Sequence, residues 1–264
     1  MNVDGGSQLL SAHGTLADQY GSNGTVTVSG AGSKWTVGDD IWVANAGTAS
    51  LNIQAGGEVD DVTGYLGYSY YHVHTGLDYY SSGSTTVTGA GSKWINSGDL
   101  YVGDYGAGTL KIQAGGEVTS NNGIVGYFYG GNATISDSGS KWINNGNIHL
   151  YSASSRNPAP GAMTVGSGAL VSTQTFTDDG NLTVSGGTLQ VGTVSGSSSA
   201  WSVAWNGGTI QNYDAYTDLS VSSNLKFSLS SVNTSNTFQI DAGRTGTVNA
   251  LLTGSGNGIG FLLT

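Results

Sequence analysis

A six-residue motif that recurs along the chain is the feature that most constrains its fold. The motif reads GAGSKW at residues 30–35, returns unchanged at residues 89–94, and returns as DSGSKW at residues 137–142. A second block reads SLNIQAGGEV at residues 50–59 and TLKIQAGGEV at residues 109–118. Both copies of the second block begin at the same distance after the tryptophan of the first motif. This fixed order identifies the chain as a repeat protein.

The residue types within the repeats set the kind of secondary structure. The 264 residues include 45 glycines and only 2 prolines. Glycine destabilises a helix by about 1 kcal/mol relative to alanine, and the Val and Thr residues that fill the repeats favour strands. We therefore expect an all-β fold with almost no helix.

Short alternations of apolar and polar residues, separated by Gly, Ser, Asn or Asp, divide each repeat into strands. The first rung, our name for one circuit of the chain, contains alternations at residues 26–28, 35–37 and 41–43. The same order begins again at residues 51–53. The second apolar residue of each first strand forms one predicted column of stacked side chains: Val28, Ile53, Val87, Ile112, Ile135, Val165, Val184, Val203 and Val221.

The second strands predict a column in which large and medium side chains alternate. Its members are Trp35, Val59, Trp94, Val118, Trp142, Leu170 and Leu189. The alternation makes the full repeat two rungs, and the interval from Trp35 to Trp94 is longer than that from Trp94 to Trp142, so it contains an insertion. Like residues that stack at every circuit predict a right-handed parallel β-helix with three strands per rung, a solenoid whose neighbouring strands lie about 4.8 Å apart. An antiparallel sandwich is the less favoured alternative, because it would not show such equal steps.

The sequence also predicts a domain organisation. We expect residues 1–24 to form an N-terminal cap or an irregular first turn, and residues 25–264 to form the β-helix. Loop insertions are predicted at about residues 71–81 and 152–160, each after a third strand, so that both leave the coil at the same corner. The final segment is still strand-like, and an open apolar sheet edge is normally covered or charged. We therefore expect the sequence to be a fragment of a longer solenoid.

Charge and cysteine content exclude several classes of partner. Seven Lys and Arg residues against 17 Asp and Glu residues give a net charge of -10, so nucleic acid and anionic membranes are poor partners. The absence of cysteine excludes disulfides and thiolate metal sites. No apolar run reaches the ~18 residues of a membrane span, so we expect no direct membrane insertion by this segment.

The repeated blocks resemble a known family. GAGSKW at residues 89–94, DLYVG at residues 99–103, GTLKI at residues 108–112 and GGEV at residues 115–118 are similar to repeats in the passenger domains of bacterial autotransporters, the type V secretion family. LTGSGNG at residues 252–258 resembles that family's autotransporter-associated β-strand repeat, although the following IGF departs from the usual polar continuation.

The resemblance implies a location and a range of activities. It implies a β-helix that is displayed at the bacterial cell surface or secreted, with a signal peptide upstream and a membrane β-barrel downstream of this sequence. Passengers of this family include adhesins, self-associating proteins, proteases and esterases. The resemblance alone therefore does not select an activity.

Aromatic residues and the two insertions indicate a candidate binding edge. Both insertions leave the coil at one corner, which also carries Tyr127, and rings there could stack on sugar faces or on a protein surface. The plainer interpretation is that Tyr rows stabilise strands and that the loops vary freely. The predicted ligand-binding residues are Tyr70, Tyr71, His72, His74, Tyr79, Tyr80, Tyr105, Phe128, Tyr129 and Arg156.

Metal and catalytic groupings are weaker. His72 and His74 could share a metal, but two imidazoles without a third ligand are more often exposed loop residues. The pairs Asp39-Asp40, Asp60-Asp61 and Asp178-Asp179 could hold Ca²⁺ or cleave a glycosidic bond. Asp is also a common turn residue, which is the favoured interpretation.

Two further observations argue against an enzyme. Polysaccharide-acting β-helices usually set acids beside a basic residue, and no Lys or Arg lies between Trp35 and Lys93. The chain contains no Gly-x-Ser-x-Gly elbow that would anchor a Ser/His/Asp triad. We therefore predict no catalytic residue, no metal and no cofactor.

The outward positions of the first strands predict a ladder of polar side chains. They are Thr27, Asn52, Thr86, Lys111, Thr134, Thr164, Thr183, Ser202 and Ser220. Such a ladder could associate with a second rod through many weak hydrogen bonds, although Thr is also an ordinary solvent-facing strand residue.

Taken together, the sequence predicts a non-catalytic adhesin or self-association module. Its predicted partner is a host surface glycan or protein, or another copy of itself. The alternative is a polysaccharide lyase or hydrolase that uses the acidic corner.

Overall fold

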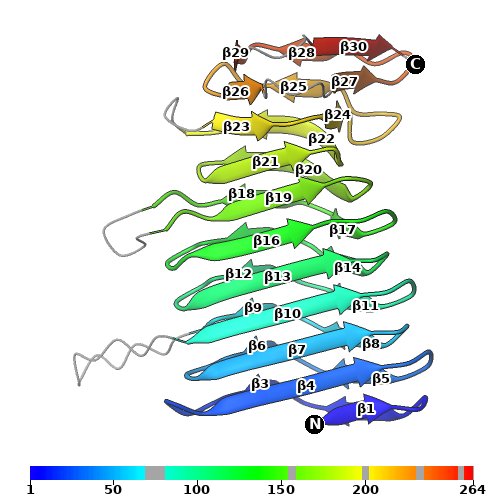
Figure 1. Ribbon diagram of the computed structural model, residues 1–264, viewed down its shortest axis with the longest axis vertical. Helices are drawn as coiled ribbons and strands as arrows, with labels where there is room; N and C mark the ends of the chain where they lie inside the picture. Colours follow the sequence, from blue (N-terminus) through cyan, green and yellow to red (C-terminus); the bar gives the residue numbers. More distant parts are fainter. Residues whose placement is uncertain (69–80, 154–158, 198–201, 230–234, 255–258, 264) are drawn as a thin grey trace.

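The computed structural model describes residues 1–68, 81–153, 159–197, 202–229, 235–254 and 259–263. These residues form strands joined by short turns, with no helix among them, and so contain none that could cross a membrane. The strands wind into a coil whose rungs stack from the N-terminus at one end to the C-terminus at the other (Figure 1). Named strands that pair across rungs run parallel, as Trp35 and Val59 of neighbouring strands illustrate. The predicted all-β parallel solenoid is thus confirmed, and the antiparallel sandwich was wrong.

Eleven strands of the described residues form one sheet, here called the first sheet. They are β1 (Asn2–Asp4), β4 (Asn23–Ser29), β7 (Thr48–Gln54), β10 (Ser82–Thr88), β13 (Ala107–Gln113), β16 (Gly131–Ile135), β19 (Ala162–Gly166), β21 (Asn181–Ser185), β23 (Ser202–Trp205), β26 (Lys226–Leu229) and β29 (Leu251–Gly254).

The other strands make up the remaining walls. The second row contains β2 (Gln8–Ser11), β5 (Lys34–Val37), β8 (Glu58–Asp61), β11 (Lys93–Asn96), β14 (Glu117–Ser120) and β17 (Lys141–Asn144). The third row contains β3 (Gly14–Leu16), β6 (Ile41–Val43), β9 (Gly64–Leu66), β12 (Leu100–Val102), β15 (Gly123–Val125) and β18 (Asn147–Leu150). Both rows continue into β20 (Leu170–Asp178), β22 (Thr188–Ser195), β24 (Gly208–Gln211), β25 (Leu219–Val221), β27 (Asn236–Ile240), β28 (Gly246–Val248) and β30 (Ile259–Leu263).

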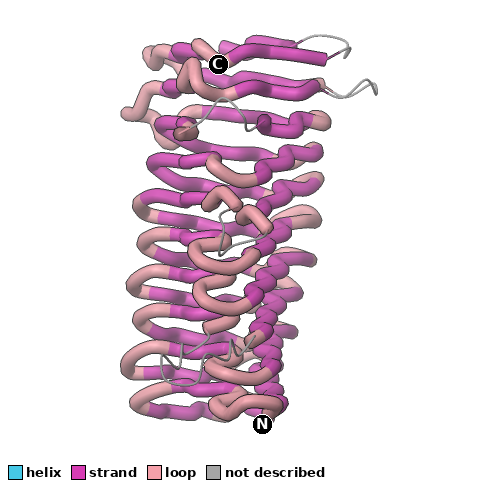
Figure 2. The backbone as a smooth tube through the Cα atoms, turned by 90° about the vertical axis from the view of Figure 1, so that its left-hand side faces the viewer, coloured by secondary structure: helices cyan, strands magenta, loops and turns pink. Residues whose placement is uncertain are grey.

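The strand pairing follows a simple rule over most of the coil. Strands β4, β5 and β6 pair with β7, β8 and β9, three places further along the chain, and the same step holds up to β17. Strand β20 then pairs with both β17 and β18, so one long strand continues two rows. Figure 2 shows the strands of successive rungs aligned in columns with loops between them. Residues 1–24 contribute β1, β2 and β3, which pair with the next rung.

The predicted columns are confirmed over the first five rungs and need three corrections beyond them. Trp35, Val59, Trp94, Val118 and Trp142 are register partners in that order. The next partner is Val171, not Leu170. The prediction was wrong here because two adjacent apolar residues could each have pointed into the core.

The first-sheet column also leaves its predicted course. Val184 pairs with Trp205, not Val203. Val203 and Trp205 are both buried, and a shift of two residues keeps the same face of the strand toward the core. The sequence of this strand alone therefore does not set its register. Val221 lies in β25 beside Val194, outside the first sheet. The sequence around Val221 alternates as a first strand does, and this pattern alone did not reveal the wall to which the strand belongs.

The recurring motif forms a corner between the first sheet and the second row. Gly89 and Gly91 have φ angles of +90° and +81°, a region that favours glycine. The Ser92 hydroxyl accepts a hydrogen bond of 3.0 Å from the Gly56 amide of the preceding rung and donates to the Thr88 carbonyl at 2.7 Å. Ser33 and Ser140 accept the same bond in their rungs. The motif is therefore a structural device that ties neighbouring corners together.

The tryptophans make pairs of rungs the packing unit. The Trp94 indole N–H donates to Asp61 Oδ2 of the preceding rung at 3.2 Å. A Cβ atom on Gly64, in the third row of that same rung, would lie 2.7 Å from the Trp94 ring. Trp35 and Trp142 repeat both relations: they donate to Ser11 and Ser120, and they lie against Gly14 and Gly123. A rung with glycine in its third strand thus leaves the space that the indole of the next rung fills.

Candidate functional site

Aromatic side chains gather on the outside of the coil along the third row. Trp42, Tyr65 and Tyr101 occupy the middle of β6, β9 and β12, where period-two alternation points them outward, and they are register partners. The corner that follows the third row adds further rings. We call the whole set the aromatic stripe: Trp42, Tyr65, Tyr68, Tyr101, Tyr105, Tyr127, Phe128 and Tyr151.

The three strand rings stack on one another. The Trp42 and Tyr65 ring centroids lie 5.9 Å apart with 5° between the ring planes, and Tyr65 and Tyr101 lie 4.9 Å apart with 15°. These separations are close to the strand spacing of the sheet. The rings therefore cover one another's faces and present their edges to solvent.

The corner rings continue the contact at steeper angles. Tyr105 stacks on Phe128 with centroids 4.4 Å apart, and Tyr127 meets Phe128 and Tyr151 edge-on at 4.2 Å and 4.9 Å. Tyr68 bridges the two groups through Tyr65 and Tyr105. Tyr105 is 41% exposed and Tyr127 is 40% exposed. The stripe thus forms a chain of touching rings that stays on the surface.

Carboxylates lie within electrostatic reach of the tyrosines. Burial raises the pKa of Tyr65 to about 12, with smaller contributions from the charges of Asp40 and Asp104. Burial also raises the pKa of Tyr101, with Asp99 and Asp104 adding to the rise. Burial, with Tyr127 and Asp179, raises the pKa of Tyr151. The phenols therefore stay neutral at physiological pH and can donate or accept hydrogen bonds beside negative charge.

Two histidines that sequence reasoning set aside border the stripe. His149 Nε2 lies 3.0 Å from Asp179 Oδ2, and the His149 ring stacks on Tyr151 at a centroid distance of 3.8 Å. His13 Nδ1 lies 3.4 Å from Asp39 Oδ2, and its ring centroid is 6.3 Å from that of Trp42. His149 is an outward residue of β18, and His13 lies at the corner just before β3. The alternation of the sequence therefore indicated that the His149 side chain faces outward. The carboxylate partner came from another rung and left no trace in the local sequence.

The structure places only part of the predicted binding set. Tyr105 and Phe128 belong to the stripe, and Tyr129 follows Phe128 at the same corner, half-buried. The others lie outside the described residues: Tyr70, Tyr71, His72, His74, Tyr79, Tyr80 and Arg156. The proposed His72–His74 metal site is among them. Within the described ranges, no three His, Asp or Glu side chains come together as metal ligands.

Sequence reasoning missed the strand members of the stripe. Trp42, Tyr65 and Tyr101 were not among the predicted binding residues, although each stands between two inward apolar or glycine positions. Their outward direction was available from the alternation. Their stacking required the register between neighbouring rungs, which local sequence does not contain.

The paired aspartates do not act as pairs. Asp60 points outward from β8 and forms an ion pair with Lys34, whereas Asp61 points inward and accepts the Trp94 hydrogen bond. The missing basic residue of this corner is thus Lys34, which the preceding rung supplies. Asp178 is buried and accepts a bond from the Gly180 amide, while its neighbour Asp179 faces His149. Asp60 and Asp61 are adjacent strand residues that face opposite sides, so this pair cannot flank one bond of a substrate.

Burial shifts the titration of the inward acids. It raises the pKa of Asp61 well above its ordinary value, against the hydrogen bond from Trp94, which lowers it. It raises the pKa of Asp178 to about 7, and that of Asp104, at the corner beside the stripe, to about 7. These groups favour their neutral form inside the coil.

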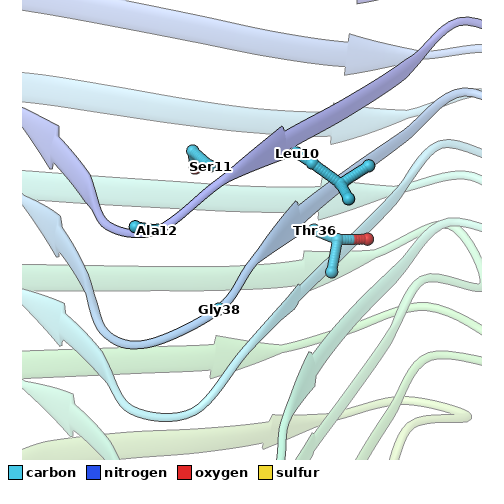
Figure 3. A pocket seen from close by; sticks show the side chains of 5 residues that line it. All are labelled: Leu10, Ser11, Ala12, Thr36 and Gly38. Atoms are coloured by element: carbon cyan, nitrogen blue, oxygen red, sulfur yellow. The ribbon is translucent and has the colours of Figure 1, made fainter.

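A shallow pocket on the second row offers little chemistry. It is lined by Leu10, Ser11, Ala12, Thr36 and Gly38, from β2, β5 and the corners after them (Figure 3). Leu10 and Thr36 are register partners, and Leu10 is 78% exposed. No lining residue is titratable, so this pocket is not a catalytic candidate.

The predicted polar ladder on the first sheet is confirmed for most of its length. Its register partners are Thr27, Asn52, Thr86, Lys111, Thr134, Thr164 and Thr183. Thr183 then pairs with Ala204, so Ser202 is displaced by one outward position, and Ser220 pairs with Thr193 in another wall. Both errors follow from the register corrections of Val203 and Val221.

Comparison with known proteins gives one informative match. A segment of 113 residues, or 43% of this chain, is 33% identical to the adhesin BmaC autotransporter of Brucella suis biovar 1 (strain 1330). That segment spans 3% of the length of the Brucella protein. No protein-family model matches the chain, and no solved structure matches it significantly. The similarity to an autotransporter adhesin, together with the parallel β-solenoid fold, confirms the resemblance of this chain to an autotransporter passenger β-helix.

Proposed function

We propose that this chain is a passenger segment, displayed at the bacterial cell surface or secreted, that acts as an adhesin or self-association module through the aromatic stripe. Its partner is a host surface molecule or another copy of the chain. The observation that carries the proposal is the unbroken contact of the stripe rings on the outside of the coil, from Trp42 to Tyr151. Contiguous exposed apolar surface on a soluble protein commonly marks an interaction site.

The support of the stripe by regular strands favours this role. Trp42, Tyr65 and Tyr101 sit on β-strands whose backbone is fixed by pairing on both sides. Aromatic side chains with few rotamers lose little entropy on binding, particularly when neighbouring rings already restrict them. Tyr and Trp are also the residues that most often dominate binding energy at interfaces. The printed name of the similar Brucella protein, an adhesin, agrees with a binding role.

The polysaccharide-acting alternative has less support. It needs two carboxyl groups that face one bond. At the acidic corner Asp60 is engaged by Lys34 and Asp61 is buried against Trp94. The similarity to an adhesin also favours binding over cleavage.

The test removes the strand rings while keeping good strand formers. The variant replaces Trp42, Tyr65 and Tyr101 by Thr. A matched control replaces Ile95 and Ile143, outward residues of the second row, by Thr. Beads coated with each purified protein are scored for attachment to cultured host cells and for bead–bead clumping. We expect the stripe variant to lose attachment or clumping by about tenfold or more, at ~1 kcal/mol or more per interface ring. Unchanged adhesion by a folded stripe variant would sink the proposal.

A further inference from the structure

We infer that the partner of the aromatic stripe is a cationic protein segment that carries Arg or Lys and lies extended along the third row. This inference rests on the proposed function and specifies the chemistry of its ligand. Three observations carry it: the direction of the ring faces, the charge around the stripe, and its length.

The direction of the ring faces disfavours a sugar. Stacking of a sugar on an aromatic side chain needs an open ring face. The faces of Tyr65 are covered by Trp42 on one side and Tyr101 on the other, and Tyr105 is covered by Phe128. What the strand rings offer instead is a row of edges and phenol oxygens. Aliphatic stems of Arg and Lys pack on such apolar edges, while phenol oxygens accept their hydrogen bonds.

Among the described residues of the third row and its corners, Asp side chains occur without Lys or Arg. Aspartates precede or follow the third-row strands at Asp18, Asp39, Asp40, Asp99 and Asp179. The buried Asp104 and Asp178 also lie there but favour their neutral form and add little charge. The described segments 12–20, 38–45, 62–68, 97–106, 121–129 and 145–153, which form this row and its corners, contain no Lys or Arg.

The positions of these acids relative to the rings agree with a cationic ligand. The charges of Asp40, Asp99 and Asp179 act on Tyr65, Tyr101 and Tyr151 respectively. Asp39 is half-exposed, with 54% of its side chain open to solvent. A guanidinium or ammonium group over the rings would therefore meet carboxylates from several rungs. The more exposed ring of Tyr127, which its neighbours meet at steep angles, adds surface for cation–π contact.

The length of the stripe sets the length of the segment. Trp42, Tyr65 and Tyr101 lie on three successive strands, and the stripe continues past β15 to Tyr151 after β18. Four strand spacings of about 4.8 Å make about 19 Å, and an extended peptide covers about 3.3 Å per residue. A segment of about six residues therefore spans the stripe.

The experiment measures binding of labelled synthetic peptides by fluorescence anisotropy. The probe is fluorescein-(Arg-Gly)4, compared with the neutral fluorescein-(citrulline-Gly)4 and with cellohexaose as a competitor. The acid variant is Asp39→Asn with Asp40→Asn. The matched control is Asp4→Asn with Glu117→Gln, which changes the net charge equally but lies on the first sheet and the second row. Each protein is measured at 0.05 M and 0.5 M NaCl.

We expect the arginine peptide to bind at least tenfold more tightly than the citrulline peptide. The acid variant should weaken this binding about fivefold, the control by less than twofold, and high salt by about tenfold, because exposed charges are screened. A shortened probe with two Arg-Gly units should bind more weakly, whereas six units should gain little.

Equal weakening by the acid variant and the control would show attraction to net charge alone and overturn the inference. Equal binding of the citrulline peptide, or displacement by cellohexaose, would overturn it in favour of a neutral ligand. The threonine stripe variant separates this inference from the proposed function. If that variant loses cell attachment but binds the arginine peptide normally, the stripe is the adhesive surface and the cationic ligand is wrong. If it attaches normally, the proposed function fails whatever the peptide does.

Discussion

Buried carboxyl groups predict that the stability of this coil falls as the pH rises toward neutrality. Burial raises the pKa of Asp104 and Asp178 to about 7 and that of Asp61 well above its ordinary value. A raised carboxyl pKa means that the folded state binds the proton more tightly than the unfolded chain, whose Asp pKa is about 3.9. The stabilising contribution is therefore full below pH ~4 and is lost as pH rises to about 7. Asp104 and Asp178 should each lower the free energy of unfolding by on the order of 2 kcal/mol between pH 5.5 and pH 7.5.

The substitution Asp104→Asn isolates one of these groups. An amide of the same shape stays neutral, so the variant should resist urea better than the parent at pH 7.5 and should lose less stability between pH 5.5 and pH 7.5, by on the order of 2 kcal/mol. Tryptophan fluorescence during urea unfolding at the two pH values gives both free energies. Asp4→Asn, which removes an exposed carboxylate, is the control. A parent protein that becomes more stable from pH 5.5 to pH 7.5 would contradict the argument.

At the residue scale the sequence predicted kinds of side chain better than their roles. The aspartate pairs were favoured as turn residues, and this was wrong for Asp60 and Asp61, which lie in β8, and for Asp178, which ends β20. Asp61 is not a turn residue that bonds its own backbone but an acceptor for the indole of Trp94 in the next rung. Such a bond depends on which rung follows which, and no local pattern contains that information.

At the scale of strands, a pair of rungs is the unit that packs. The backbone at position 64 does not require glycine, since the φ angle there lies outside the positive region. The position needs glycine for space, because a Cβ would lie 2.7 Å from the Trp94 ring and 2.5 Å from Asn96 Oδ1. The charge on the outer surface of the second row alternates in step with the interior. Its register partners are, in order, Lys34, Glu58, Lys93, Glu117 and Lys141.

A double-mutant cycle tests the coupling between Gly64 and Trp94. Gly64→Ala should destabilise the parent by about 1–3 kcal/mol through overpacking. The same change should cost less in a Trp94→Val background, which removes the ring, and the coupling should be about 1–2 kcal/mol. Urea midpoints of the four proteins give the cycle. Gly123→Ala, which meets Trp142 instead, is the matched control and should cost the same in both backgrounds. Absence of coupling at Gly64 would mean that the indole does not occupy the space that glycine leaves.

The strand pattern allowed most of the first five rungs to be predicted, and the physical reason is the two-rung repeat. Large and small side chains alternate there with fixed spacing, so only one register satisfies Trp35, Trp94 and Trp142 together. Past β18 the tryptophan column ends, and adjacent apolar residues such as Leu170 and Val171 fit the core equally well. The stripe was missed for a related reason. Outward residues do not constrain packing, so the prediction followed the unusual insertion and not Trp42, Tyr65 or Tyr101.

At the scale of the whole molecule, a solenoid is stabilised by contacts between neighbouring rungs, which makes it tolerant of losing complete units. The unit here is two rungs, so the tolerance should depend on how many are removed. Removing residues 94–141 joins Lys93 to Trp142, and Trp142 then follows Val59 as Trp94 did. The indole again meets Gly64 and Asp61. The contact of an indole with glycine and its hydrogen bond to the preceding rung are thus kept in kind.

Removing the single rung 94–117 should be the more harmful change, although it deletes half as much chain. Val118 then follows Val59, so the Trp-sized space above Gly64 stays unfilled and Asp61 loses its indole donor. A cavity of that size and an unpaired buried acceptor cost about 3 kcal/mol or more. We therefore expect the two-rung deletion to unfold in one transition near the urea midpoint of the parent, and the one-rung deletion at a clearly lower midpoint. Circular dichroism and tryptophan fluorescence measure both. If the shorter deletion proves as stable as the longer one, single rungs are interchangeable and the pairing of tryptophan with glycine does not set the repeat.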